Sequence, residues 1–399
     1  DLRAQGEEER KNIVSEKMKT QPSIIQRMPL PLALLSGFLL LPLGGILLPI
    51  TPEIGVPLLL VATRLLGRRF QWARRFNAWI DGKWQGVRAR LKGDSSSGRP
   101  ALWRWIVGAV VIVLIWQVLG SILLVGAVLW MGIPFDALVP PGGFGLAPIA
   151  PELSAMILFA FLVSFVPFFL ANLFAYRYIL KERVMRMFTL TGTFSIQRTF
   201  AGFAIWLAIG LGGLLLLELA NPGVVRWTFN PVGALPYVVV ALVLLPIQTT
   251  AEELFFRGWL LQWSDNGRRR RWVLATLNGV LFALPHLANP EVAGEDLIRI
   301  IGYVAIGFGW AWVTLRDRTL ELAIGAHAAN NISAALLVGY VGSAIPSVSF
   351  WTMERIPVLQ EVLLGVASIL IFTWITARLP HNRAGKSSTS QASRKKQPA

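Results

Sequence analysis

The feature that most constrains this chain is a series of long apolar segments that follow one another after residue 100. A helix needs roughly 20 mostly apolar residues to cross a bilayer, and about eight windows of that kind occur. Because lipid offers no partner to backbone N–H and C=O groups, such windows predict helices. We therefore predict an all-α, polytopic membrane helix bundle with about eight transmembrane helices. The predicted spans are residues 103–130, 153–176, 201–219, 235–256, 272–287, 297–315, 320–340 and 358–377.

The composition agrees with lipid as the main solvent. Of the 399 residues, 54% are hydrophobic and 15% are charged, and the mean hydropathy is +0.56, which is too apolar for a soluble protein of this length. The 16 Trp residues suit a membrane protein, because indole rings favour the headgroup region. The absence of cysteine excludes disulfides, thiolate metal sites and cysteine nucleophiles.

Positive residues fall on alternate loops, as expected when the basic loops stay in the cytoplasm. There are 38 Lys and Arg against 22 Asp and Glu, and we attribute this excess to membrane orientation rather than to nucleic-acid binding. The C-terminus is therefore predicted to be cytoplasmic, in a prokaryotic plasma or internal membrane. Basic residues gather in 64–104, 177–198, 257–271, 316–318 and the C-terminal tail, whereas 134–152, the loop after Ala220, 291–296 and 341–349 are poor in them.

The first hundred residues differ from the bundle. The apolar stretch 29–66 is broken by several prolines and glycines and has basic residues on both sides, which favours a re-entrant hairpin, with one broken span as the alternative. Residues 70–91 mix aromatic with basic side chains, as an interfacial amphipathic helix does. No cleavable signal peptide is expected in 1–27, and the start lies upstream or at Met18.

These patterns predict four segments. Residues 1–28 are expected to be a polar tail, and 29–100 to contain the membrane hairpin, the basic amphipathic helix and a Ser- and Gly-rich linker from Gly93 to Pro100. Residues 101–378 are expected to form the transmembrane bundle, and 379–399 to be a disordered, basic cytoplasmic tail.

Ionisable residues inside apolar spans point to a functional site, because each costs several kcal/mol in lipid. Glu252 and Glu253 follow an apolar run, and Arg257 lies four residues after Glu253, on the same helix face. Neighbouring helix residues project about 100° apart, so one carboxylate can be paired while the other is left free to act.

Two of the 3 histidines also fall within apolar spans. Phe282 lies four residues before His286, and Asn331 lies four residues after His327, so each pair shares a helix face. A carboxylate, two imidazoles and a carboxamide from three spans can activate water and stabilise an oxyanion, which indicates hydrolysis. Taken singly, each set also fits a structural role: a buried ion pair, a histidine at a helix contact, or interhelical hydrogen bonds.

Together the patterns Glu-Glu-x-x-x-Arg, Phe-x-x-x-His and His-x-x-x-Asn resemble the CPBP family. This family contains CAAX proteases and bacteriocin-processing or self-immunity proteins related to the Ras-converting prenyl endopeptidase. The resemblance covers roughly residues 200–340, a protease-like core. It implies that Glu252 and His286 activate the attacking water and that His327 and Asn331 bind the oxyanion. It also implies that Glu253 and Arg257, with Phe282, support the site.

The leading functional hypothesis is an intramembrane endopeptidase of the CAAX-protease type, whose partners are the bilayer and a membrane-associated protein or peptide. One alternative is a non-enzymatic scaffold or bacteriocin-immunity protein of the same fold. A less favoured one is a proton-coupled transporter, since acids and histidines in spans also form proton relays. No nucleic-acid partner is expected, and the oligomeric state is left open.

No cofactor is certain, and zinc is left open. Glu252, His286 and His327 offer ligand types that zinc accepts, yet no HExxH helix is present, and a metal-free, glutamate-activated water serves equally. Counting residues along the spans places Glu252 nearer the cytoplasmic side and His286 deeper than His327. This mismatch requires either a shifted helix boundary or a bend at Pro285, and a site that opens towards the cytoplasm is favoured.

Overall fold

The computed structural model describes residues 28–47, 52–91, 100–138, 150–265, 269–290, 292, 297–354 and 357–380. The chain divides into two compact units, residues 1–102 and residues 103–399. The predicted N-terminal tail up to residue 27, the linker at 93–99 and the C-terminal tail after residue 380 lie outside the described residues.

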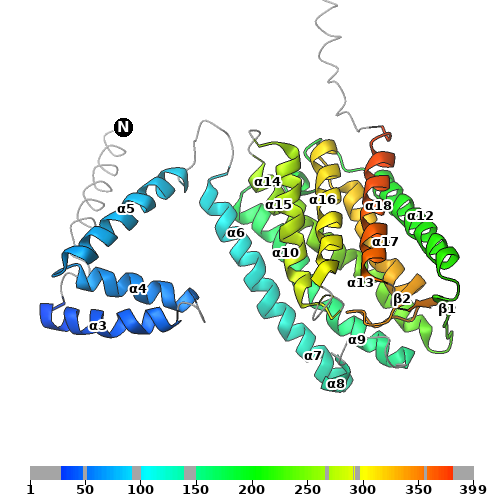
Figure 1. Cartoon of the computed structure of the whole chain (residues 1–399), viewed down its shortest axis with the longest axis horizontal. Coiled ribbons are helices and arrows are strands. Elements are labelled where there is room, and N and C mark those ends of the chain that lie inside the picture. Colours follow the sequence, from blue (N-terminus) through cyan, green and yellow to red (C-terminus); the bar gives the residue numbers. More distant parts are fainter. Residues whose placement is uncertain are drawn as a thin grey trace, which may run out of the picture. The chain divides into compact units, whose positions relative to one another are not determined.

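The described part of the N-terminal unit consists of helices α3 (Leu30–Leu47), α4 (Pro52–Leu66) and α5 (Gln71–Leu91). Helices α3 and α4 lie side by side (Figure 1). An ion pair between Arg64 and Asp81 and a 2.8 Å hydrogen bond from Asn77 to the carbonyl oxygen of Thr63 connect α4 to α5. The predicted hairpin thus contains two helices, and its depth in a bilayer stays a prediction.

The second unit is a helix bundle, and each predicted span overlaps a helix (Figure 1). Among the described residues, five helical stretches are long and apolar enough to cross a membrane: 102–131, 151–179, 196–220, 234–264 and 358–376. The prediction of an all-α, multi-pass membrane protein is confirmed, whereas the number of eight crossings stays a prediction. The helices are α6 (Leu102–Ile115), η2 (Trp116–Gly120), α7 (Ser121–Met131), α8 (Phe135–Leu138), α9 (Pro151–Val163), α10 (Phe165–Phe174), η3 (Ala175–Ile179), α11 (Met185–Phe188), α12 (Ile196–Ala220), α13 (Ala234–Glu253), η4 (Leu254–Leu261), α14 (Gln262–Ser264), α15 (Arg271–Ala283), η5 (Leu284–Ala288), η6 (Leu297–Arg299), α16 (Ile300–Asp317), α17 (Glu321–Ile332), η7 (Ser333–Leu337) and α18 (Val358–Thr376).

The helix that carries the two glutamates is longer than predicted. Helix α13 runs without a break into the π-helical segment η4 and ends in α14 at Ser264, whereas the predicted span ends at Phe256. Glu252 therefore lies well inside a span of 31 residues rather than close to its end. The π-helical turns begin directly after Glu253, and such turns often occur at functional sites.

A small sheet, which was not predicted from the sequence, lies at one end of the bundle. Its strands β1 (Val225–Trp227), β2 (Val338–Tyr340) and β3 (Trp351–Met353) have the order β1-β3-β2. Strands β1 and β3 are antiparallel, whereas β2 and β3 are parallel. The residues of β2 belong to a window predicted to be wholly helical, so the helix ends earlier than expected. We call this the sheet end; α12 and η7 end there, and α18 begins there (Figure 1).

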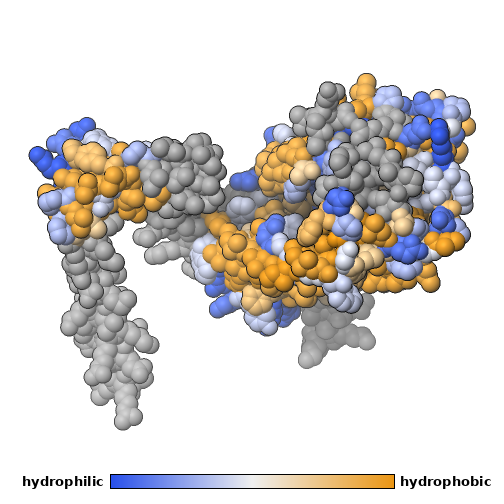
Figure 2. All heavy atoms as spheres, turned by 90° about the horizontal axis from the view of Figure 1, so that it is seen from below, coloured by the Kyte–Doolittle hydropathy of each residue, from blue (hydrophilic) through white to orange (hydrophobic). Residues whose placement is uncertain are grey.

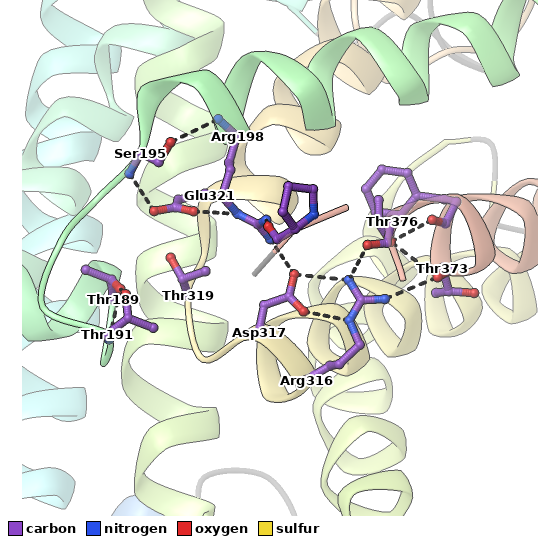
Figure 3. Close-up of polar contacts among 12 residues, drawn as sticks. Thr189, Thr191, Ser195, Arg198, Arg316, Asp317, Thr319, Glu321, Thr373 and Thr376 are labelled. Carbon is purple, nitrogen blue, oxygen red and sulfur yellow. Dashed lines mark hydrogen bonds and ion pairs between the residues drawn. The ribbon is translucent and has the colours of Figure 1, made fainter. Parts of the chain in front are cut away.

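At the opposite end, a network of charged side chains joins four helices (Figure 3). Arg198 of α12 pairs with Asp317 of α16 at 2.5 Å and with Glu321 of α17 at 2.9 Å. Arg316 bonds Asp317 at 2.6 Å and donates to two carbonyl oxygens in the last turns of α18. Two guanidinium groups thus balance two carboxylates. We call this the basic end, at which α12 and α17 begin and α16 and α18 end.

Small residues allow helices α15 and α16 to pack close together. A Cβ atom on Gly307 of α16 would lie 2.8 Å from the Cα atom of Gly279 on α15, so the two backbones touch. Aromatic side chains fill the space beside this contact, among them the buried Phe282, Trp310 and Phe372. Close backbone contact and aromatic packing together fix the position of α15 and α16.

The outer surface of the bundle suits contact with lipid. Large hydrophobic side chains are exposed along α6, α7, α12 and α18, with Trp130 82% and Leu219 69% exposed. Figure 2 shows hydrophobic residues over much of the face seen there. Apolar surface of this extent is the expected exterior of a membrane protein.

Candidate active site

Glu253 and Arg257 form a buried ion pair one helical turn apart, as their spacing predicts. Arg257 Nη1 donates to Glu253 Oε1 at 2.9 Å, and both side chains are 0% exposed. Arg257 Nη2 donates to the carbonyl oxygen of Gly307 at 3.2 Å. The guanidinium also lies 4.4 Å from the centre of the Phe282 ring, within cation–π range. Arg257 therefore connects its own helix to α15 and α16.

His327 of α17 contacts both glutamates. Its Nδ1 lies 2.8 Å from Glu253 Oε1, and its Nε2 lies 3.6 Å from Glu252 Oε2. The imidazole also packs against the Trp310 ring, with 4.6 Å between the ring centres. When Nδ1 carries a proton, it donates to Glu253 and leaves Nε2 facing Glu252. These contacts hold the orientation of the ring.

Glu252 differs from Glu253 in its surroundings. Its side chain is 13% exposed and lines a cavity. Gln248, one turn earlier on α13, donates from Nε2 to Glu252 Oε1 at 2.5 Å. Within the part of the chain that the structure describes, Glu252 Oε2 has no hydrogen-bond donor. One carboxylate oxygen is thus fixed by Gln248, while the other is buried beside His327 Nε2 with its lone pairs unused.

A chain of amide groups leads from Glu252 to α12. Asn331 Nδ2 donates to Gln248 Oε1 at 3.0 Å, and Asn330 Nδ2 donates to Asn331 Oδ1 at 3.1 Å. Trp206 Nε1 in turn donates to Asn330 Oδ1 at 3.3 Å. Each amide is oriented by the next one in the chain. Because an NH2 group carries two hydrogens, Asn331 keeps a second donor besides the one that it gives to Gln248.

His286 lies on the short 3₁₀ helix η5, which continues α15 from Leu284 onward. Its Nδ1 lies 2.8 Å from the carbonyl oxygen of Phe282, and its ring stacks on Tyr303 with 4.3 Å between the ring centres. The change from α to 3₁₀ helix occurs next to Pro285, where the sequence analysis considered a bend. That change and the longer α13 together remove the predicted mismatch in depth.

All four predicted catalytic residues line one cavity of about 320 Å³, a size typical of ligand pockets. They are Glu252, His286, His327 and Asn331. Phe282 also lines it, whereas Glu253 and Arg257 lie behind the wall as supports. The remaining polar lining includes Gln248, Asn289, Tyr303 and Asn330, and apolar side chains of α9 and α10 complete the wall.

Several residues that line this cavity or orient its side chains were not predicted from the sequence. Gln248 lies four residues before Glu252 and Asn330 lies next to Asn331, so the same helix-face argument could have found both. Tyr303 and Trp310 belong to α16, a helix without any recognised motif. Only the packing of α16 against α15 and α17 brings these two rings to the histidines.

The cavity lies towards the sheet end of the bundle. Its walls include Asn289 after η5, Tyr303 in the first turns of α16, and residues 340 and 343–346 beside the sheet. The cavity thus lies nearer the sheet end than the basic end, and the predicted opening towards the cytoplasm stays a prediction. The predicted span ended at Phe256 rather than at Ser264, which placed Glu252 too close to the basic end.

Zinc was left open, with Glu252, His286 and His327 as its ligands if it is present. Among the described residues, no three His, Asp or Glu side chains are grouped closely enough to hold a metal ion. Glu252, His286 and His327 share a cavity but are no such group. The chemistry proposed below therefore uses no metal.

Comparisons with known proteins agree with the geometry. Residues 231–333 match the family described as type II CAAX prenyl endopeptidase Rce1-like. All seven motif residues, from Glu252 to Asn331, fall within that range. The chain is 31% identical over 203 residues to the uncharacterized protein YyaK of Bacillus subtilis, a match that covers 50% of this chain and 68% of YyaK. No solved structure matches the chain.

Proposed function

The chain belongs to the Rce1-like family of type II CAAX prenyl endopeptidases, and from this premise we propose that it hydrolyses a peptide bond of a membrane-associated protein or peptide in the cavity around Glu252. Its family and its apolar helices make it a multi-pass membrane protein of the peptidase class. The observation that carries the finer proposal is that Glu252, His286, His327 and Asn331 come from three helical stretches and line one cavity.

Glu252 is proposed as the general base. Its Oε2 accepts a proton from a water molecule, and the resulting hydroxide attacks the carbonyl carbon of the scissile bond. The π electrons of the carbonyl move to its oxygen, which gives a tetrahedral oxyanion. When this intermediate collapses, the C–N bond breaks and Glu252 returns its proton to the leaving amine. Gln248 supports this role, because it holds Oε1 and leaves Oε2 without a hydrogen-bond donor among the described residues.

His327 and Asn331 are proposed to stabilise the oxyanion. The amide of Asn331 can donate its second N–H, and a protonated His327 can donate from Nε2 while Nδ1 stays on Glu253. His286 is proposed to assist Glu252 in orienting the water from the opposite wall of the cavity. Glu253 and Arg257 hold these groups in place by joining α13, α15 and α16.

The test is to replace Glu252 by Gln, which keeps the shape of the side chain but removes the base. In purified protein, peptide hydrolysis should fall by about 10²- to 10⁴-fold, because general-base catalysis supplies rate factors of that order. Glu182→Gln is the matched control, since Glu182 pairs with Arg186 in an exposed ion pair at the basic end. Hydrolysis by Glu252→Gln at the parental rate would reject the proposal.

A further inference from the structure

The cavity and the charges of the bundle together indicate on which side of the membrane the substrate lies. We propose that the cavity receives a peptide from the extracytoplasmic face, so that the substrates are extracytoplasmic segments of membrane-associated proteins. The substrate class rests on the proposed peptidase function. The side of access rests on geometry and charge alone.

The cavity is closed towards the basic end. On α17, residues 321–329 are all buried. On α16, Trp310, Val313, Thr314 and Asp317 are buried. Arg257 on η4, which follows Glu252 in the direction of the basic end, is fully buried as well. The Arg198–Asp317 pair lies still further towards the basic end. A peptide that came from this end would have to displace several layers of packed side chains.

Towards the sheet end a second cavity adjoins the first. This second cavity, of about 310 Å³, shares Tyr303, Ile306, Asn330, Ala334 and Tyr340 with the first. It extends to Arg299, Glu354 and Glu361, which are polar groups of the sheet end. Tyr303, Asn330 and Ala334 are only partly buried, in contrast to the residues that close the other end. In the proposed mode of access, the path from the sheet end to Glu252 runs through these two adjoining cavities.

The two ends of the bundle differ strongly in charge. Basic residues gather at the basic end in the short loops at 177–186, 269–271 and 316–318 and at Arg378. Among the described residues of the sheet end, Arg226 and Arg299 are basic, and each is paired with a glutamate at 2.9 Å. Lys and Arg in short loops stay on the cytoplasmic side. The basic end is therefore cytoplasmic, and the path to Glu252 begins on the other face.

Because the chain has no cysteine, single cysteines report which face each end occupies. Ala344→Cys introduces a thiol in the cavity wall near the sheet, and Arg270→Cys introduces one in an exposed basic loop. Cells that express the full chain are treated with a membrane-impermeant charged maleimide, before and after permeabilisation. In intact cells we expect the maleimide to modify Ala344→Cys at least ten times as much as Arg270→Cys. Arg270→Cys should be modified only after permeabilisation. Failure of Ala344→Cys to react in intact cells overturns the inference.

A second measurement separates this inference from the proposed function. New peptide termini in the membrane proteome are compared between cells with the parent and cells with Glu252→Gln. Termini that depend on Glu252 should map to extracytoplasmic segments, and mapping to cytoplasmic segments overturns the inference while leaving the peptidase intact. If no terminus depends on Glu252, the peptidase proposal fails, and the maleimide result still decides the side of access.

Discussion

Glu252 and Glu253 are adjacent in the chain but have different surroundings, since neighbours on an α-helix project about 100° apart. Glu253 is buried with Arg257 and His327, whereas Glu252 reaches the cavity. This division could be predicted from spacing alone. The position of Gln248 between Glu252 and Asn331 could not be predicted in full, because it depends on how closely α17 approaches α13.

Replacing Gln248 by Ala should lower kcat more than it changes KM. Glu252 then loses a hydrogen bond to its charged carboxylate, worth roughly 1.5–3 kcal/mol, which corresponds to about a 10- to 100-fold loss of rate. The measurement is steady-state peptide hydrolysis by purified protein. Gln262→Ala is the matched control on the same helical stretch, because its amide bonds carbonyl oxygens of α11 near the basic end. An unchanged kcat for Gln248→Ala would contradict the positioning role.

Replacing Arg257 by Met should destabilise the protein by about 3–5 kcal/mol, because the carboxylate of Glu253 is then left buried without its partner. Thermal unfolding in detergent measures this loss. The double replacement Arg257→Met with Glu253→Gln should recover part of it, since no unpaired carboxylate remains. A double variant no more stable than Arg257→Met would show that packing, rather than charge, sets the cost.

At the scale of elements, the apolar windows predicted where helices lie but not how several of them end. The three-residue strands could not be predicted, because their hydrogen bonds join segments far apart in the chain, such as Val225 with Met353. The continuation of α13 through η4 was missed because Arg257 interrupts the apolar run, and its charge is balanced only by the fold. The candidate site residues came from their spacing and from the family resemblance, and their shared cavity could be seen only once the helix ends were known.

The charged network at the basic end joins α12, α16, α17 and α18 (Figure 3). Asp317→Ala removes a carboxylate that both Arg198 and Arg316 contact, so it should cost about 3–5 kcal/mol, as expected for breaking a buried ion pair. Glu182→Ala, which breaks an exposed pair, should change stability by less than about 1 kcal/mol. Unfolding in detergent compares the two, and equal effects would contradict the structural role of the network.

At the scale of the whole molecule, one end of the bundle is basic and packed, and the other carries the sheet and the path to Glu252. The alternation of loop charge was readable from the sequence, but the end on which the cavity opens was not. The end on which the cavity opens depends on the burial of side chains of α16 and α17, such as Trp310 and Ala323. Their burial is determined only by the packed structure.

The packed side chains between the cavity and the basic end also limit the passage of ions through the protein. An aqueous chamber open at both ends would conduct protons and ions, driven by roughly 2.3 kcal/mol per charge for each 100 mV of membrane potential. The buried residues 321–329, with Trp310 and Arg257, separate the chamber from the basic end. In the proposed peptidase, water for hydrolysis can therefore enter the cavity without a continuous aqueous passage to the basic end.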